Sequence, residues 1–329
     1  MVEINGEGVT DAYRDMLWKM HTYAIEENSR NGKVLTIVPP VLLTIHDPID
    51  RLLRDPSRNA NPFFHAMEFV WMMAGSDDAA WIGQFNKQML QYANLGRLRG
   101  AYGARWMKGD QIQAVIDKLR RDTATRQAVL SMWDPIEDNM SGVSDVCCNT
   151  HIFFRVRGTR LNMTVCNRSN DVVWGMLGAN VVHMTLLQEL ITHCTGLSMG
   201  TYSVFSVNAH MYERHWPLIE TRTSVRVPPL EEYYPLLYGK ETYEDFAGDC
   251  RHFLEGGFGG SECRWMEEVA EPIYFAWKDY KAGNTHSCLE GIDEIKADDW
   301  RIACREWILR KYASIAEQDK SSGTTQNSS

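Results

Sequence analysis

The chain has 329 residues, of which 44% are hydrophobic and 23% charged, a composition typical of a globular protein. A net charge of -9, without any block of five or more basic residues, argues against a broad nucleic-acid-binding groove. No apolar run approaches the roughly 18 residues needed to cross a membrane, and the N-terminal segment lacks the basic and apolar regions of a signal peptide. We therefore expect a cytoplasmic protein whose eight cysteines are mostly free thiols.

The first third of the chain alternates helical and extended patterns. An apolar stripe predicts a helix from about Thr10 to Glu26, and an extended stretch, interrupted by two prolines, follows from Val34 to Leu43. A second helix is expected to begin at Asn61, a favourable N-cap residue followed by proline, and to end at Gly75. A third helix is expected at about residues 110–121.

The middle of the chain favours antiparallel strands around one long helix. Strands are expected at residues 127–133, 150–156, 161–166 and 202–208. A short turn at Gly158 joins the second strand to the third, so these two should form a hairpin. The apolar spacing from Asn180 to Thr195 predicts an amphipathic helix that ends at Gly196.

The composition changes at about residue 239, and the rest of the chain contains acidic, aromatic-rich helical segments. The clearest of these is Trp300–Tyr312. We expect a catalytic domain over residues 1–238, a helical C-terminal extension of the same domain over 239–317, and a disordered tail over 318–329. The mixed order of helices and antiparallel strands predicts an α+β fold of layered sheet and helices.

Cys148 stands at the entry to the predicted hairpin, and Arg168-Ser169 stands where the hairpin returns. An arginine beside a thiol stabilises the thiolate, and an arginine next to a serine can hold a phosphate. Glu68 is the acidic residue of an otherwise largely apolar helix, where burial would raise its pKa and make it a usable proton relay. The plainer alternatives are a core thiol and a salt-bridged carboxylate.

His210 and Tyr212 are two residues apart, so on an extended segment their side chains share a face. An imidazole and a phenol together suit a sugar hydroxyl. The alternative is a satisfied polar pair at the end of a strand.

In this order the motifs resemble the thymidylate synthase family, which includes phage dCMP and dUMP hydroxymethylases. The resemblance extends from about Arg30 to His215 and keeps a spacing of 20 residues between the cysteine and the arginine. The residues that carry it are Glu68–Trp71, Ala101–Trp106, Thr125–Val129, Trp133, Cys148, Arg168–Asp171, Gly175, Asn180 and His210–Tyr212.

The resemblance implies a thymidylate synthase-like fold, with sheets back to back in a homodimer. It implies a pyrimidine nucleoside 5′-monophosphate as substrate, 5,10-methylenetetrahydrofolate as co-substrate, and no metal. It implies no direct contact with nucleic acid or membrane.

The resemblance also assigns roles to individual residues. Cys148 would add to C6 of the pyrimidine, while Glu68 and Tyr102 would organise water and proton transfer. Asp171 would take part in catalysis and, with Trp174 and Gly175, contact the folate. The nucleotide-binding residues would be Arg30, Arg168 and Ser169 for the phosphate, Arg126 for the phosphate of the other subunit, Asn180 for the base, and His210 and Tyr212 for the ribose 3′-hydroxyl.

The chain departs from the synthases at several positions. Cys147 replaces a proline, Asn149 a histidine and Gln127 a second arginine, and the segment from Gly175 to Asn180 is one residue longer. A helical extension and a polar tail stand where a synthase has an apolar segment that closes over the site. A site without that closure admits water more easily, which favours a hydroxymethyl product over a methyl product.

The amide of Asn180 can meet either uracil or cytosine. The hypothesis is therefore hydroxymethylation of dUMP or dCMP, with a slight preference for uracil. Thymidylate synthesis and CMP hydroxymethylation are the alternatives within the family, and a phage source is compatible with the family analogy. Two rivals lie outside it: a hydrolase using Cys148, His210 and Asn180, and a nucleotide-binding protein without catalysis.

Overall fold

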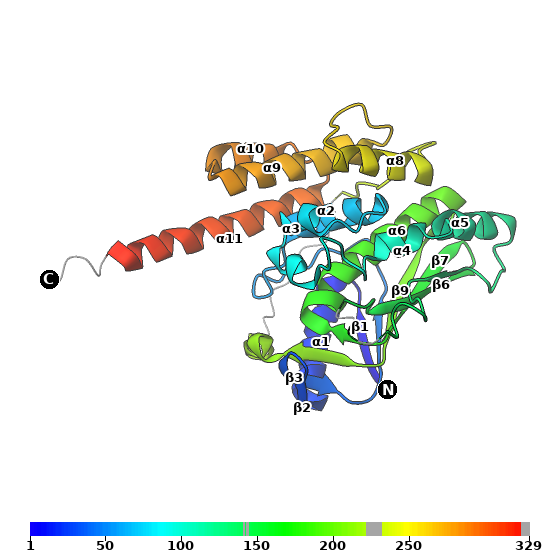
Figure 1. Ribbon diagram of the computed structural model, residues 1–329, viewed down its shortest axis with the longest axis horizontal. Coiled ribbons are helices and arrows are strands. Elements are labelled where there is room, and N and C mark those ends of the chain that lie inside the picture. Colours follow the sequence, from blue (N-terminus) through cyan, green and yellow to red (C-terminus); the bar gives the residue numbers. More distant parts are fainter. Residues whose placement is uncertain (141, 143–144, 222–231, 324–329) are drawn as a thin grey trace.

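The structure, a computed structural model, describes residues 1–140, 142, 145–221 and 232–323, with side chains up to residue 314. Within these ranges no helix is both long and apolar enough to cross a membrane. The described chain folds into two sheets and a set of helices (Figure 1). The thymidylate synthase-like expectation of mixed sheet with packed helices agrees with this arrangement.

The larger sheet has six strands and mixes parallel with antiparallel pairs. In spatial order its strands are β1 (Val2–Gly6), β4 (Val41–Ile45), β9 (Ser198–Ser206), β7 (Arg160–Asn167), β6 (Asn149–Arg157) and β5 (Val129–Ser131). The expected hairpin is confirmed, since β6 and β7 pair antiparallel with Arg157 opposite Arg160. It brings Arg168 back beside Cys148, where the arginine backbone N–H donates to the cysteine carbonyl at 3.1 Å.

A smaller sheet of four strands, which the sequence did not separate from the larger one, forms one side of the molecule. Its order is β2 (Ala24–Ser29), β3 (Gly32–Ile37), β10 (Ala209–Tyr212) and β8 (Asn170–Asp171). The first helix, α1 (Val9–Tyr23), ends three residues before the predicted Glu26. The reason is tertiary, because Ala24–Ser29 pairs residue for residue with β3 and pairing overrides the helical pattern.

Two predicted helices are confirmed with their caps. In α2 (Pro62–Met73) the side chain of Asn61 accepts a hydrogen bond from the backbone N–H of Phe64 at 3.3 Å. The long helix α6 (Asn180–Thr195) ends at Gly196, whose φ of 69° is the left-handed conformation that glycine adopts at little cost. Helix α5 (Gln111–Arg121) is also confirmed. The strand expected at 202–208 instead begins at Ser198 and ends at Ser206.

The residues after 239 are mostly helical, and most of these helices pack on α2. The elements are α8 (Tyr243–Leu254), η4 (Met266–Ala270), α9 (Glu271–Ala282), α10 (Thr285–Asp293) and α11 (Asp298–Gly323). Phe63 of α2 lies 5.6 Å from the Trp277 ring and 5.7 Å from the Trp307 ring, between centroids. These helices therefore share the core of the rest of the chain. Of the tail predicted at 318–329, residues 318–323 belong to α11 and 324–329 lie outside the described residues.

Figure 1 shows how the layers place a cavity. Helices α5 and α6 lie against the sheet that contains β6, β7 and β9, and the C-terminal helices lie over α2. The short elements α3 (Ala79–Gly83), η1 (Lys87–Tyr92) and α4 (Tyr102–Met107) follow α2, while η2 (Val172–Ala179) leads into α6. Residues of η1, α4, the start of α6 and β10 line the cavity described next.

Candidate active site

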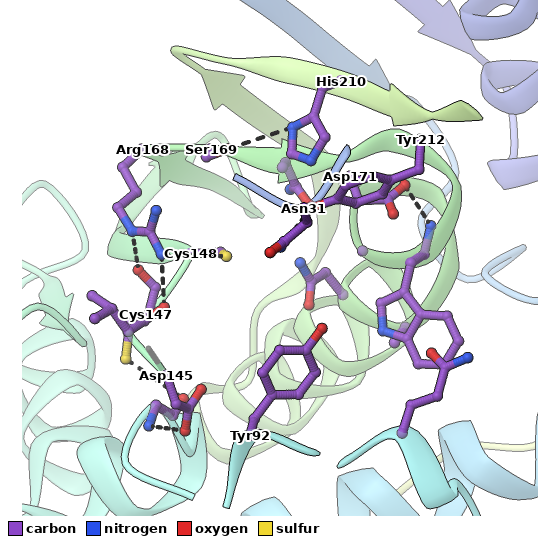
Figure 2. A pocket seen from close by; sticks show the side chains of 18 of the residues that line it. Asn31, Tyr92, Asp145, Cys147, Cys148, Arg168, Ser169, Asp171, His210 and Tyr212 are labelled. Atoms are coloured by element: carbon purple, nitrogen blue, oxygen red, sulfur yellow. Dashed lines mark hydrogen bonds between the residues drawn. The ribbon is translucent and has the colours of Figure 1, made fainter. Parts of the chain in front are cut away.

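A cavity of about 570 Å³ lies between the two sheets and the helices α2 and α6. Its lining includes every residue singled out from the sequence except Arg126. Figure 2 shows the sulfur of Cys148, the side chain of Asn31 and the hydroxyl of Tyr92 facing the same open space, with Arg168 and His210 at its edge. Residues as far apart in the sequence as Asn31 and Tyr212, 181 positions, are thus gathered around one cavity.

The guanidinium of Arg168 is held in place beside that thiol. Its Nε donates to the carbonyl of Cys147 at 2.9 Å and its Nη2 to the carbonyl of Val146 at 2.8 Å, while Nη2 also lies 3.8 Å from the Cys148 sulfur. Burial raises the pKa of Cys148, and the charge of Arg168 opposes that rise. Arg168 therefore acts to lower the pKa of Cys148, as the sequence predicted. Burial has the larger effect, so the pKa of the thiol is raised overall.

The sulfur of the neighbouring Cys147 points away from the centre of the cavity. It is 1% exposed, its sulfur lies 3.5 Å from the carbonyl of Gly100, and burial raises its pKa to about 12. Asn149, on the other side, is also buried, and its side-chain oxygen accepts a hydrogen bond from Asn167. Both cysteines line the cavity, but the sulfur of Cys148 faces the open space, whereas the sulfur of Cys147 points to the Gly100 carbonyl.

A cationic and polar edge surrounds the thiol on the side of the smaller sheet. Arg30, in the turn between β2 and β3, lines the cavity, and its charge acts to lower the pKa of Cys148. Ser169 Oγ lies 3.5 Å from His210 Nδ1, which is also 3.2 Å from Asn208 Oδ1. Two guanidinium groups and a hydroxyl that line one cavity are suited to a phosphate.

His210 and Tyr212 share a face of β10, as their spacing predicted, with ring centroids 5.2 Å apart. Burial lowers the pKa of His210, and Asp171 opposes that shift, so the imidazole is neutral near pH 7 and can both donate and accept. Asn31 Nδ2 donates to the hydroxyl of Tyr212 at 3.4 Å. These side chains suit a sugar hydroxyl.

Glu68 and Tyr102 line the opposite side of the cavity. Burial raises the pKa of Glu68 to about 8, and burial also raises the pKa of Tyr102 well above its ordinary value. The Tyr102 hydroxyl lies 3.4 Å from the backbone N–H of Asn149, which donates to it. Both groups therefore keep their protons at neutral pH and can give them up near the ligand.

Asp171 has a structural role besides its place in the lining. Its Oδ1 accepts hydrogen bonds from the backbone N–H groups of Val173 and Trp174, at 2.8 and 3.1 Å, and so caps η2. A Cβ at Gly175 would lie 2.4 Å from Asn170 Oδ1 and 3.1 Å from Asn180 Nδ2. Glycine at position 175 is therefore needed for those two amides to approach the same corner.

Some of the lining was not foreseen from the sequence. Gln88, Met89 and Tyr92 come from η1, a segment without a regular apolar period, and Asp145 and Arg214 complete the wall. Together with Trp71 and Trp174 they form an aromatic and partly polar wall. Flat aromatic side chains of this kind fit the pterin ring of a folate, so the lining fits the co-substrate that the resemblance implies.

Arg126 does not reach the cavity. It is exposed on the loop before β5, and that loop is tied to the larger sheet because Arg155 Nη1 donates to the carbonyls of Ala124 and Thr125, at 2.8 and 3.0 Å. Among the described residues no cluster of His, Cys, Asp or Glu is arranged to hold a metal ion.

The mixed sheet and the thiol clamped by an arginine, with side chains around it that suit a phosphate and a sugar hydroxyl, fit an enzyme that acts on a nucleotide. The family model for thymidylate synthase matches residues 58–234, more than half of the chain, and the protein belongs to the thymidylate synthase family.

The chain is similar in sequence to phage deoxyuridylate hydroxymethyltransferases and to thymidylate synthases. A deoxyuridylate hydroxymethyltransferase of Pseudomonas phage M6 is 32% identical over 338 residues, covering 96% of each chain. A protein of the same description from Bacillus phage SP01 is 31% identical over 64% of this chain and 59% of its own. A thymidylate synthase of Shewanella piezotolerans is 31% identical over 52% of this chain and 60% of its own.

Proposed function

We propose that the protein transfers a hydroxymethyl group to C5 of a pyrimidine nucleoside 5′-monophosphate, with dUMP as the favoured substrate. The observation that carries the proposal is the Cys148 sulfur, which faces the cavity 3.8 Å from the clamped Arg168 guanidinium. The product type is supported by similarity along 96% of a phage deoxyuridylate hydroxymethyltransferase, since that likeness includes the C-terminal helices.

The residues act in a defined order. Arg30, Arg168 and Ser169 hold the phosphate and fix the ring against the thiol, which supplies the orientation that the addition needs. The thiolate of Cys148 adds to C6, and the charge moves onto the ring oxygen and C5. Bound methylenetetrahydrofolate supplies the one-carbon unit.

Proton transfers on the ring fall to Glu68 and Tyr102. A carboxyl with a pKa of about 8 is close to the working pH, so it can donate and accept without a large cost in either direction. Loss of the C5 proton, with tetrahydrofolate as the leaving group, gives an exocyclic methylene at C5 while the Cys148 sulfur is still bonded to C6. Water adds to that methylene carbon as the thiolate of Cys148 leaves C6, and Asp145 and Tyr92, which line the same cavity, are groups that can hold the water by hydrogen bonds.

Asn180 reads the base at the first turn of α6. Its amide can donate to O4 and accept from N3–H of uracil, and a flipped amide can serve cytosine. Hydroxymethylation of dCMP or CMP is therefore the nearest alternative in substrate, and methylation of dUMP the nearest in product.

We also propose a homodimer in which the six-stranded sheets lie back to back. The face of the sheet away from α5 and α6 carries Phe153, 43% exposed, directly opposite Val129, 36% exposed. Phe205 of β9 is half-buried on the same surface. Exposed apolar side chains on an open sheet face are typical of an interface. In such a dimer Arg126, which is exposed and does not line its own cavity, would bind the phosphate of the other subunit, as the family resemblance implies.

The test is incubation of the protein with methylenetetrahydrofolate and, separately, dUMP, dCMP or CMP, followed by mass spectrometry of the nucleotide. A gain of CH2O on dUMP supports the proposal. A gain of CH2, accompanied by the absorbance rise of dihydrofolate, identifies a synthase instead. Exchange of the C5 hydrogen that disappears in Cys148→Ala separates catalysis from silent binding.

A further inference from the structure

Behind the cavity wall, the Glu68 carboxyl meets a histidine that no step of the proposed reaction uses. His183 of α6 is 1% exposed, and its Nε2 lies 3.5 Å from Glu68 Oε2. That oxygen is buried and accepts no hydrogen bond from any residue in the described part of the chain. The Glu68 side chain is nevertheless 14% exposed and lines the cavity. Its carboxyl thus has an inner oxygen towards His183 and an outer side towards the ligand.

The tautomer of His183 follows from a second contact. Nε2 lies 3.1 Å from the backbone oxygen of His65, and a carbonyl can only accept, so Nε2 must carry the hydrogen. Burial lowers the pKa of His183 to about 3, which keeps the ring neutral in the neutral pH range. His183 therefore presents a fixed N–H, which donates to a backbone carbonyl and lies beside the inner oxygen of Glu68, with Nε2 3.5 Å from that oxygen.

The other titratable and charged groups near this corner do not replace that donor. From α2, the ring of His65 stands at 89° to the His183 ring, with centroids 6.3 Å apart, and burial lowers its pKa well below the ordinary value. From α4, Tyr102 is protonated because burial raises its pKa. Arg58, in the loop before α2, donates its Nε to the carbonyl of Val173 at 2.8 Å.

We propose that His183 is a positioning residue for Glu68. Its Nε2–H donates to the inner oxygen when Glu68 ionises, and so holds the outer oxygen towards the nucleotide. The inference rests on the proposed function only in giving Glu68 a proton-relay role. Asn180 and His183 are three residues apart, so a single turn of α6 serves the base and the carboxyl together.

The consequence is measurable without turnover. A hydrogen bond to the ionised form makes proton loss easier, so removal of the N–H should make Glu68 a weaker acid. We would titrate the carboxyl by NMR in protein labelled with 13C at glutamate Cδ, assigning Glu68 by the signal lost in Glu68→Gln. The wild-type midpoint should lie at about 8.

In His183→Leu the midpoint should rise by about one pH unit, a tenfold weaker acid, because a bond to a charged acceptor is lost. In His183→Gln, whose amide N–H can reach a similar position, it should return towards the wild-type value. Thr185→Val is the matched control. Thr185 is equally buried on the same helix, and its hydroxyl donates to the carbonyls of Val181 and Val182, at 2.7 and 3.2 Å.

An unchanged midpoint in a folded His183→Leu protein would overturn the inference. If that variant does not fold, 15N NMR spectra of the wild-type protein can determine the tautomer of His183. The Nε2–H tautomer from pH 5 to 9 would support the positioning role. The Nδ1–H tautomer or an imidazolium would contradict it. Kinetics give a further check, because the pH profile of kcat should move with the midpoint while nucleotide affinity stays constant. Failure of the proposed function would appear differently, as an absence of C5 exchange in the wild type.

Discussion

Replacement of Glu68 by glutamine should stabilise the protein at neutral and alkaline pH while it impairs catalysis. The folded carboxyl keeps its proton up to about pH 8, whereas an unfolded glutamate ionises near its ordinary value of 4.5. Between these two values the folded state binds more protons than the unfolded state. The free energy of unfolding therefore falls as the pH rises from 4.5 to 8, and this loss is specific to an ionisable residue 68.

The size of the effect follows from the two pKa values. One pH unit corresponds to about 1.4 kcal/mol, so the two and a half units between 4.5 and pH 7 amount to about 3 kcal/mol. Above pH 8 the difference should level off at about 4 to 5 kcal/mol. Because the side chain is only 14% exposed, solvent screening should reduce these values little. Glutamine, which cannot ionise, should show none of this pH dependence.

Urea unfolding of Glu68→Gln and wild type at pH 5, 7 and 8.5, at one protein concentration, measures the difference. Glu3→Gln changes an exposed carboxyl on β1 and is the control for a general effect of charge. The stability gain of Glu68→Gln should grow with pH. A gain that is equal at pH 5 and pH 8.5 would refute the reasoning, since it would mean that Glu68 ionises in the folded protein as it does in the unfolded chain.

Three further outcomes follow from the site. Alkylation of the cavity thiol by iodoacetamide should continue to accelerate above pH 9, because burial raises the pKa of Cys148; peptide mass spectrometry should find the label there and leave Cys147 unmodified. Asn180→Asp should lower kcat/KM for dUMP by about tenfold or more relative to dCMP, since a protonated carboxyl can donate to N3 of cytosine; an unchanged ratio would remove Asn180 from base recognition. Arg126→Ala and Cys148→Ala should each be nearly inactive, but equal mixtures that exchange subunits should recover about a quarter of wild-type activity, because half of the dimers then contain one complete site. No recovery, despite subunit exchange shown by native mass spectrometry, would place Arg126 outside the neighbouring site.

The sequence predicted the elements whose local signals agree with their environment. The cap at Asn61 and the glycine at 196 defined α2 and α6 because the residues at these helix ends satisfy backbone groups locally. The hairpin of β6 and β7 followed from strict alternation and a short turn. That hairpin alone was enough to place Arg168 beside Cys148.

Features set by distant partners were not predictable in the same way. Helix α1 stops at Tyr23 because the next residues pair with β3, and nothing local marks that change. The contact from Asn31 to Tyr212 joins residues 181 positions apart. The wall from η1 lacks a regular period, so Tyr92 could be found only from the fold. The position of His183 behind Glu68 could not be predicted from the sequence for a related reason. Helix α6 is buried on most of its circumference, so a polar residue in it has no distinctive pattern.

The central claim is that the thiol of Cys148 prepares C5 of the nucleotide for a carbon that ends as a hydroxymethyl group. The mass of the product formed from dUMP and methylenetetrahydrofolate tests it most directly. The account predicts a nucleotide heavier by CH2O, formed without dihydrofolate and absent with Cys148→Ala. A nucleotide heavier by CH2, or a product that still forms in Cys148→Ala, would contradict it.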